Sequence, residues 1–150
     1  MAESREELFE VLRHLQTMVA FELRRPLIDS MELQYLRYPG DGGFYGKHHD
    51  HSPFDDQNIV QRSISILLYL NDRQWDADSD GGVLRAYPKG QPAVEVVPKG
   101  GTLVLFDSKM VEHEVLPTNS ERFAVVGWFH AKNRNPKKKK VCQKVRKRKR

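Results

Sequence analysis

Two histidines and one aspartate in this 150-residue chain are spaced so that they could bind a metal ion together. His48 and Asp50 stand two residues apart, and His113 follows 63 residues after Asp50. Because residues i and i+2 of an extended segment point to the same side, His48 and Asp50 can face one metal ion. Two imidazoles and one carboxylate leave three coordination positions open, as in non-haem Fe(II) sites that react with O2. We therefore predict an iron site at His48, Asp50 and His113.

The same segment allows other interpretations. A single His-x-Asp triplet arises by chance in polar loops, and a lone histidine at a strand edge is usually packed or solvated. The histidine cluster also permits a second ligand set, in which His49 and His51 join His113 as in metal-binding cupins. A structural zinc site favours cysteine ligands, and the only cysteine, Cys142, lies near the C-terminus.

Arg122 adds a second chemical requirement. It follows nine residues after His113 and opens the largely apolar run 122–129. An arginine that begins a strand is usually a surface charge. A buried cation beside a metal, however, needs an anion to offset its desolvation, and a guanidinium fits a carboxylate in bidentate geometry. A cosubstrate that chelates the metal at one end and carries a second carboxylate meets both demands, and 2-oxoglutarate is such a molecule.

A β-rich domain behind one helix must position these side chains. A capping-box pattern at Ser4 and Glu7 predicts a helix start, and apolar residues at three- and four-residue spacing over positions 8–23 predict a helix that ends near Pro26 and packs on a sheet. Short β-type runs separated by turn residues follow. The predicted strands are 33–38, 63–70, 83–87, 93–97, 102–106, 114–116 and 123–129. One helix and seven or eight strands predict a mainly β sandwich or jelly-roll.

Charge divides the chain into a domain and a tail. Residues 131–150 hold 12 of the 25 Lys and Arg residues and no acidic residue, whereas residues 1–130 carry a net charge of −7. We therefore predict one domain, 1–130, and a disordered basic tail, 131–150. The tail has no aromatic residue for base stacking, so we expect salt-dependent contact with RNA, the ribosome or another polyanion rather than sequence-specific reading.

The cellular setting follows from cysteine content and hydropathy. With one cysteine, no intrachain disulfide can form, which fits a reducing compartment. The N-terminal residues contain no apolar run typical of a signal peptide, and no stretch approaches the roughly 20 apolar residues of a membrane-spanning helix. We expect an intracellular monomer, cytoplasmic or nuclear, without membrane contact.

Six motifs occur in order between residues 33 and 129. They are Tyr38-Pro-Gly-Asp-Gly, Tyr45-Gly-Lys-His-His-Asp50, Arg62-Ser-Ile-Ser-Ile-Leu-Leu-Tyr-Leu-Asn71, Asp80-Gly-Gly-Val-Leu-Arg85, His113-Glu-Val-Leu-Pro117 and the run 122–129. Together they resemble the 2-oxoglutarate oxygenases of the prolyl-4-hydroxylase group, which includes the hypoxia-sensing prolyl hydroxylases. The resemblance covers roughly two-thirds of the chain.

The resemblance implies a double-stranded β-helix, or jelly-roll, with the N-terminal helix packed on it. It implies hydroxylation of a protein side chain, with proline the expected target, driven by Fe(II), 2-oxoglutarate and O2 and releasing succinate and CO2. Ascorbate is a further cofactor that it suggests. Only one helix precedes Leu33, fewer elements than the hypoxia-sensing members have, so the resemblance says more about the chemistry than about the substrate.

The resemblance also assigns roles to individual residues. The implied iron ligands are again His48, Asp50 and His113. The implied 2-oxoglutarate contacts are Arg122, Tyr69 and Tyr38, while Arg62 would lie at the pocket mouth near the substrate and Trp128 close to the metal. Two other functions stay open at this point: a cupin-like metal-binding or sensing module without turnover, and a nucleic-acid-associated protein that acts through its basic tail.

Overall fold

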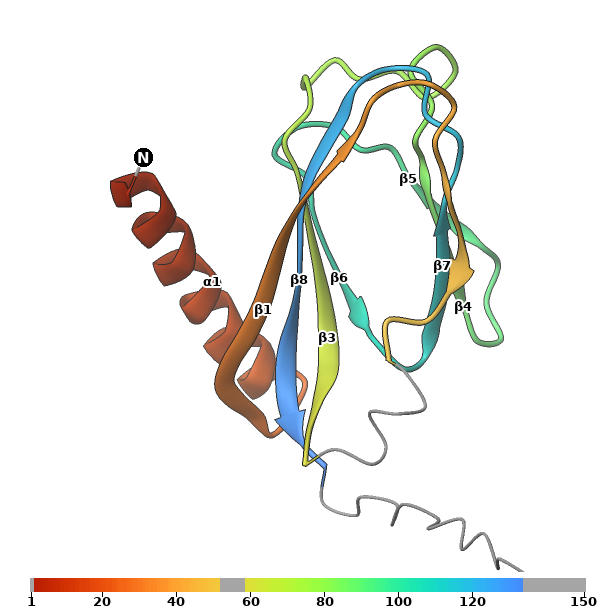
Figure 1. Cartoon of the computed structure of the whole chain (residues 1–150). Coiled ribbons are helices and arrows are strands. Elements are labelled where there is room, and N and C mark those ends of the chain that lie inside the picture. Colours follow the sequence, from red (N-terminus) through yellow and green to blue (C-terminus); the bar gives the residue numbers. More distant parts are fainter. Residues whose placement is uncertain (1, 52–58, 134–150) are drawn as a thin grey trace, which may run out of the picture.

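The computed structural model describes residues 2–51 and 59–133 of the chain. In this part of the chain one helix, α1 (Ala2–Glu22), precedes eight strands. Figure 1 colours these elements by their position in the sequence. The strands are β1 (Leu27–Tyr38), β2 (Tyr45–His48), β3 (Val60–Tyr69), β4 (Leu84–Pro88), β5 (Val94–Val96), β6 (Leu103–Asp107), β7 (Val111–Val115) and β8 (Arg122–Lys132).

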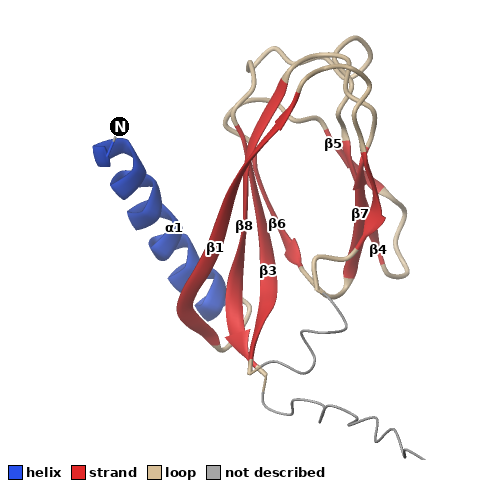
Figure 2. Ribbon diagram, in the orientation of Figure 1, coloured by secondary structure: helices blue, strands red, loops and turns tan. Residues whose placement is uncertain are grey.

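The strands form two antiparallel sheets that lie face to face (Figure 2). One sheet has the order β1-β8-β3-β6 and the other the order β2-β7-β4-β5. Successive strands cross from one sheet to the other except at the β4–β5 hairpin. This arrangement is the double-stranded β-helix, so the predicted mainly β jelly-roll is confirmed.

Helix α1 packs on the outer face of the first sheet (Figure 1). Its buried residues Leu12 and Val19 join Ile64, Ile66 and Phe129 in one apolar cluster. The predicted helix is therefore confirmed, and it ends four residues before Pro26, as the sequence pattern indicates. The predicted helix start at Ser4 is wrong, because the helix begins at Ala2 and Ser4 lies within its first turn.

All seven predicted strands are present, and residues 45–48 form an additional strand, β2. Strand β1 begins six residues before its predicted start, where Leu27 and Met31 pack against the α1 cluster. Strand β8 continues to Lys132, so the predicted boundary at residue 130 falls within a strand. The predicted tail from residue 134 onward lies outside the described residues, and its disorder and polyanion binding stay predictions.

A second apolar cluster lies between the two sheets and limits the space for the site. It contains Leu67, Tyr69, Leu84, Val115 and Ala124, which come from strands of both sheets. Alternation along β3 and β8 explains the two clusters, because successive side chains point to opposite faces of the sheet. One face therefore meets α1, while the other faces the interior between the sheets.

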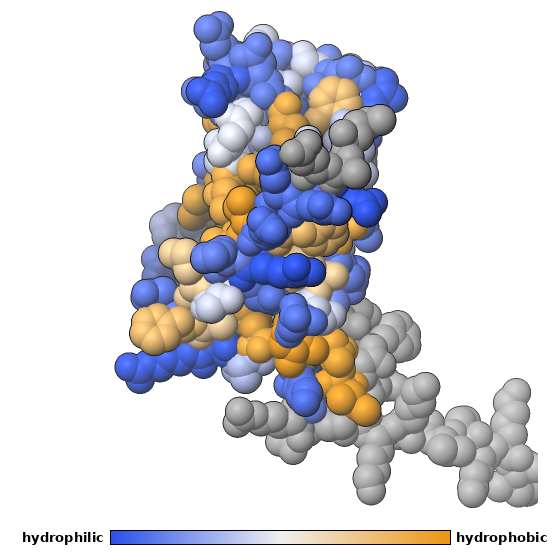
Figure 3. Space-filling view, turned by 90° about the vertical axis from the view of Figure 1, so that its left-hand side faces the viewer, coloured by the Kyte–Doolittle hydropathy of each residue, from blue (hydrophilic) through white to orange (hydrophobic). Residues whose placement is uncertain are grey.

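The outer surface mixes charged and apolar residues. On the side that carries α1, orange apolar patches lie among blue polar side chains (Figure 3). Exposed helix residues such as Val11, Met18 and Phe21 belong to the apolar part of the surface. Within the described residues, no helix combines the length and apolar character that crossing a membrane requires.

Candidate metal centre and cosubstrate pocket

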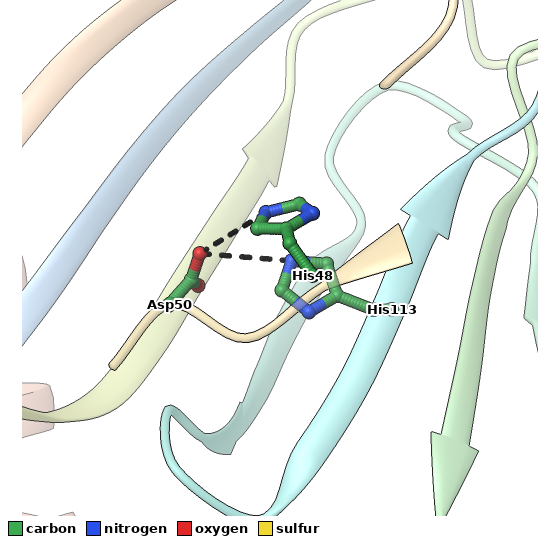
Figure 4. A group of neighbouring side chains, drawn as sticks. All are labelled: His48, Asp50 and His113. Atoms are coloured by element: carbon green, nitrogen blue, oxygen red, sulfur yellow. Dashed lines mark ion pairs between the residues drawn. The ribbon is translucent and has the colours of Figure 1, made fainter. Parts of the chain in front are cut away.

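The pairing of β2 with β7 brings the two predicted histidine ligands together. His48 lies opposite His113 in the register of these strands, and their ring centroids are 4.2 Å apart. Asp50 approaches both rings from the segment that follows β2 (Figure 4). Its Oδ1 atom lies 3.4 Å from His48 Nε2 and 3.7 Å from His113 Nε2. One potential ligand atom from each residue lies within 4.8 Å of the others, which suits a shared metal ion.

Backbone carbonyls orient both imidazole rings toward Asp50. His48 Nδ1 lies 2.9 Å from the Gly46 carbonyl oxygen, and His113 Nδ1 lies 3.3 Å from that of Val111. A carbonyl can only accept a hydrogen bond, so each Nδ1 carries the proton in the neutral ring. The lone pairs of both Nε2 atoms are therefore free to coordinate a metal, as the second-shell contacts of metal-binding histidines usually ensure.

Two serines hold the carboxylate of Asp50 in place. Ser65 Oγ donates to Asp50 Oδ2 at 2.6 Å and lies 2.9 Å from Ser108 Oγ. Burial would raise the pKa of Asp50, but the adjacent His48 ring, the hydrogen bond from Ser65 and the nearby His113 lower it to about 2. Asp50 is therefore an anionic ligand at neutral pH.

The alternative ligand set is not assembled in the described structure. His49 is exposed, whereas the metal-binding group consists of His48, Asp50 and His113. His51 is buried, and its backbone N–H donates to the Ser108 carbonyl at 3.0 Å. The geometry therefore favours two histidines and a carboxylate over three histidines.

A buried arginine occupies the far end of the space between the sheets. Arg122 is the first residue of β8 and only 1% exposed, and its Nε donates to the Gly82 carbonyl oxygen at 3.1 Å. Its guanidinium lies 5.1 Å from the ring centroids of both Tyr38 and Tyr69. Arg122 Nη2 and the Tyr69 hydroxyl are buried and have no hydrogen-bond partner among the described residues.

The electrostatics at this end suit an anion. Burial raises the pKa of Tyr69 to about 12 against the opposing charge of Arg122, so Tyr69 keeps its hydroxyl proton. Burial likewise lowers the pKa of Arg122, although a guanidinium stays charged at neutral pH. A buried cation and a buried hydroxyl without partners are costly, and a carboxylate would satisfy both. The residues present therefore fit the distal end of a dicarboxylate.

Gly82 makes the position of Arg122 possible. Its φ of +66° lies in the left-handed region, and a Cβ at this position would stand 2.8 Å from Arg122 Cδ. The same Cβ would meet the Thr118 hydroxyl oxygen at 3.1 Å. The absence of a side chain lets the β4 side of the pocket approach Arg122 closely enough to accept its hydrogen bond.

A single cavity of about 400 Å³ connects the metal-binding group with Arg122. Its lining residues are Gln34, Leu36, Tyr38, Tyr45, His48, His49, Asp50, Arg62, Leu67, His113, Val115, Arg122, Val126 and Trp128. Tyr69 does not line this cavity; it is fully buried beside Arg122. The cavity is large enough for a small ligand, and both polar and apolar side chains line it.

Arg62 and Trp128 both line the cavity and contact each other. The Arg62 guanidinium carbon is 3.5 Å from the centroid of the Trp128 ring, and Arg62 Nη2 donates to Glu32 at 2.7 Å. Sequence reasoning missed Glu32, Ser65 and Ser108. Ser65 had a usable signal, since it stands four residues before Tyr69 and so shares its face of β3.

A jelly-roll whose two sheets enclose two histidines and a carboxylate beside a buried arginine defines a class of metal-dependent oxygenases. Residues 33–130 match the family model of the 2OG-Fe(II) oxygenase superfamily. The chain belongs to this superfamily, whose chemistry uses Fe(II), 2-oxoglutarate and O2.

Individual relatives agree with the family. The chain is 39% identical over 113 residues to prolyl hydroxylase EGLN3 of Mus musculus, a match that covers 73% of this chain and 45% of that protein. A solved prolyl-4-hydroxylase of Pseudomonas putida has a TM-score of 0.77 and 35% identity, covering 88% of this chain and 67% of that one.

A third relative was solved with a peptide. It is a prolyl hydroxylase from Trichoplax adhaerens in complex with a hypoxia inducible factor peptide fragment, with a TM-score of 0.74 and 29% identity. The match covers 85% of this chain and 56% of that one. The chain spans less than half the length of the curated relatives EGLN3 of Mus musculus and the hypoxia-inducible factor prolyl hydroxylase of Caenorhabditis elegans.

Proposed function

We propose that the chain hydroxylates a proline residue in a protein or peptide, using Fe(II), 2-oxoglutarate and O2 and releasing succinate and CO2. The observation that carries this proposal is the cavity that joins the metal-binding group to the buried Arg122 guanidinium, whose Nη2 has no hydrogen-bond partner among the described residues. Proline as the target is supported by the names of the relatives, which are prolyl hydroxylases. A peptide substrate is supported by the Trichoplax adhaerens relative, which was solved with a peptide fragment.

We assign the metal to His48, Asp50 and His113, whose two Nε2 atoms and one carboxylate face each other. When bound there with 2-oxoglutarate, Fe(II) would supply the activation of O2 for hydroxylation of an aliphatic carbon. Backbone carbonyls and Ser65 orient the three ligand side chains before the metal arrives. Such preorganisation lowers the cost of assembling the site.

We assign the distal carboxylate of 2-oxoglutarate to Arg122, with Tyr69 and Tyr38 beside it. Arg122 can donate from Nη2 and Tyr69 from its hydroxyl, since neither atom has a partner within the described residues. Tyr38 lines the cavity and places its ring 5.1 Å from the guanidinium. Leu36, Leu67 and Val126 form apolar walls between the two ends, which favour exclusion of water from the reacting groups.

The two other functions gain no support from the site. A cupin-like module that merely holds a metal would not need a buried arginine whose Nη2 lacks a hydrogen-bond partner, and the three-histidine ligand set is not assembled among the described residues. A function through the basic tail concerns residues outside the described part of the chain. We keep contact of this tail with RNA or another polyanion as a separate prediction, together with a cytoplasmic or nuclear location and a monomeric state.

An anaerobic titration tests the cosubstrate site. Fe(II) and 2-oxoglutarate are added separately and together while the visible metal-to-ligand charge-transfer absorption is followed. We expect a band that requires both additions and that is lost or strongly weakened in Arg122→Met. Exposed Arg37→Met serves as the matched control and should leave the band unchanged. A folded wild-type chain that binds Fe(II) but shows no band with 2-oxoglutarate would contradict the proposal.

Turnover tests the substrate. Pooled acetylated decapeptides with a fixed central proline are incubated with the chain, Fe(II), ascorbate, 2-oxoglutarate and O2, and the peptides are analysed for a mass gain of one oxygen atom. Matched pools with central alanine should gain none. Succinate formation in the absence of hydroxylated proline would support the oxygenase chemistry and reject proline as the target.

A further inference from the structure

Four side chains, two of which line the cavity, form one network across three neighbouring strands. Arg62 Nη2 donates to Glu32 Oε2 at 2.7 Å, and His130 Nε2 lies 3.0 Å from Glu32 Oε1. The Arg62 guanidinium carbon lies 3.5 Å from the centroid of the Trp128 ring. Glu32 is on β1 and Arg62 is on β3, so their ion pair spans β8, the strand that carries Trp128 and His130.

Glu32 is itself held from the opposite side. Ser30 Oγ lies 2.8 Å from His130 Nδ1. When the Ser30 hydroxyl donates to Nδ1, the ring proton of neutral His130 is on Nε2 and is donated to Glu32. Each carboxylate oxygen of Glu32 then accepts one hydrogen bond, one from His130 and one from Arg62. The hydrogen bond from Arg62 lowers the pKa of Glu32 against the opposing effect of burial, so the carboxylate stays ionised at neutral pH.

Some N–H groups of Arg62 are not used within this network. A guanidinium has five N–H groups in a rigid plane. One donates to Glu32, and one lies 3.4 Å from the backbone carbonyl oxygen of Asp50. The guanidinium lies over the Trp128 ring, while the Arg62 side chain is 29% exposed and lines the cavity. The other N–H groups can therefore meet a ligand that enters the mouth.

We propose that Glu32 is a positioning residue that holds the Arg62 guanidinium against the Trp128 ring, in the orientation that Arg62 needs for the substrate contact that the resemblance implies for it. The substrate part of this inference rests on the proposed function, whereas the positioning part does not. Glu32 does not line the cavity and acts through Arg62. A flexible arginine would lose rotamer freedom on binding, and the hydrogen bond to Glu32 restricts that freedom in advance.

If the Glu32–Arg62 ion pair only stabilised the fold, its loss would lower the unfolding temperature. The Glu32 side chain is 43% exposed, and exposed ion pairs contribute little to folding stability. We therefore expect Glu32→Ala to leave the unfolding temperature nearly unchanged. Any change in the environment of Trp128 or in peptide use would then report positioning rather than loss of the fold.

Tryptophan fluorescence tests the positioning part without a substrate. The chain has two tryptophans, so in a Trp75→Phe background the emission comes from Trp128 alone. We expect Glu32→Ala and Arg62→Ala to shift this emission in the same direction, and the double variant to match Arg62→Ala. Glu95→Ala, which breaks the exposed ion pair with Arg85, is the control and should have no effect. An unchanged emission in Glu32→Ala, or additive shifts in the double variant, would overturn the proposal.

Peptide kinetics test the second part. With the proline-centred decapeptide pools, Glu32→Ala should raise the apparent KM about tenfold, the effect expected for one misplaced charged hydrogen bond, and leave kcat nearly unchanged. Glu32→Gln keeps an acceptor oxygen for Arg62 and should restore part of the loss. A wild-type KM in Glu32→Ala would reject the substrate part. If the wild-type chain consumes no 2-oxoglutarate, the proposed function fails, and the fluorescence measurement still decides the role of Glu32.

Discussion

His48 and His113 face each other across the β2–β7 pair, with ring centroids 4.2 Å apart, although 64 positions separate them in the sequence. This register decides the metal-binding group, because it sets the distance between the two Nε2 atoms that flank Asp50. A shift of β2 by one residue would turn His48 to the other face of the sheet. The site therefore depends on strand pairing as much as on its residue types.

Removing one histidine ligand should abolish tight iron binding. We expect His113→Ala to lose stoichiometric Fe(II) binding because the remaining His48 and Asp50 supply only two ligands. Anaerobic equilibrium dialysis with Fe(II) measures this, and circular dichroism checks the fold. The exposed His14→Ala variant is the control and should bind one Fe(II) per chain. One tightly bound Fe(II) per folded His113→Ala chain would contradict the assigned ligands.

Replacing Arg122 should separate stability from cosubstrate binding. Arg122→Met removes a buried, partly unpartnered cation, so the free energy of unfolding should stay equal or rise. Affinity for 2-oxoglutarate should fall by about 2–5 kcal/mol, the range for truncating one partner of a buried charge pair. Denaturant titration and isothermal calorimetry measure the two quantities. A large loss of stability with unchanged affinity would show that Arg122 is structural.

The serine that holds Asp50 should tune metal affinity. Ser65→Ala removes the 2.6 Å hydrogen bond to Asp50 Oδ2, and loss of such outer-shell partners typically weakens metal binding about 10- to 100-fold. Competition with a chelator of known Fe(II) affinity measures the change. Exposed Ser79→Ala is the control, since the Ser79 hydroxyl donates to Asp76 Oδ1 and not to a residue of the metal-binding group. Equal Fe(II) affinities of Ser65→Ala and wild type would refute this role.

Adding even a methyl group at position 82 should destabilise the fold. Gly82→Ala places a Cβ 2.8 Å from Arg122 Cδ at a φ of +66°, so both steric overlap and backbone strain oppose folding. We expect destabilisation by about 1–3 kcal/mol and weaker 2-oxoglutarate binding. Gly90→Ala isolates the backbone contribution, because Gly90 has a φ of +74° with no atom within 4 Å of the added Cβ. Equal thermal stabilities of the two variants would show that overlap of the added Cβ with Arg122 does not contribute to the destabilisation.

The helix should contribute through its buried face. Leu12→Ala removes a side chain that is 3% exposed and packed against the first sheet, so the free energy of unfolding should fall by about 2–5 kcal/mol. Val11→Ala, at a position 64% exposed, should change it little. Chemical denaturation of both variants measures the contrast, and similar losses would show that α1 does not pack as described.

The sequence alone indicated the fold class, the single helix, the strand positions and the metal-binding residues. Apolar periodicity was sufficient for the helix and strands because α1 buries one stripe and the strands alternate between two environments. His48 and Asp50 could be recognised together because both lie in one short segment, and His113 and Arg122 because their order matches a known family. Strand ends were less certain, since packing of Leu27 and Met31 on α1 extends β1 beyond its local pattern.

Only the tertiary structure decided which side chains support that site. Glu32, Arg62 and His130 come from three different strands, and no local pattern relates them. Ser108 reaches Asp50 only through Ser65, from a position 43 residues further along the chain. The choice of His48 and Asp50 over His49 and His51 likewise required the β2–β7 register. Hydrogen bonds between distant residues depend on register and on which face of a strand a residue occupies, and those are fixed only when the two sheets close around the pocket.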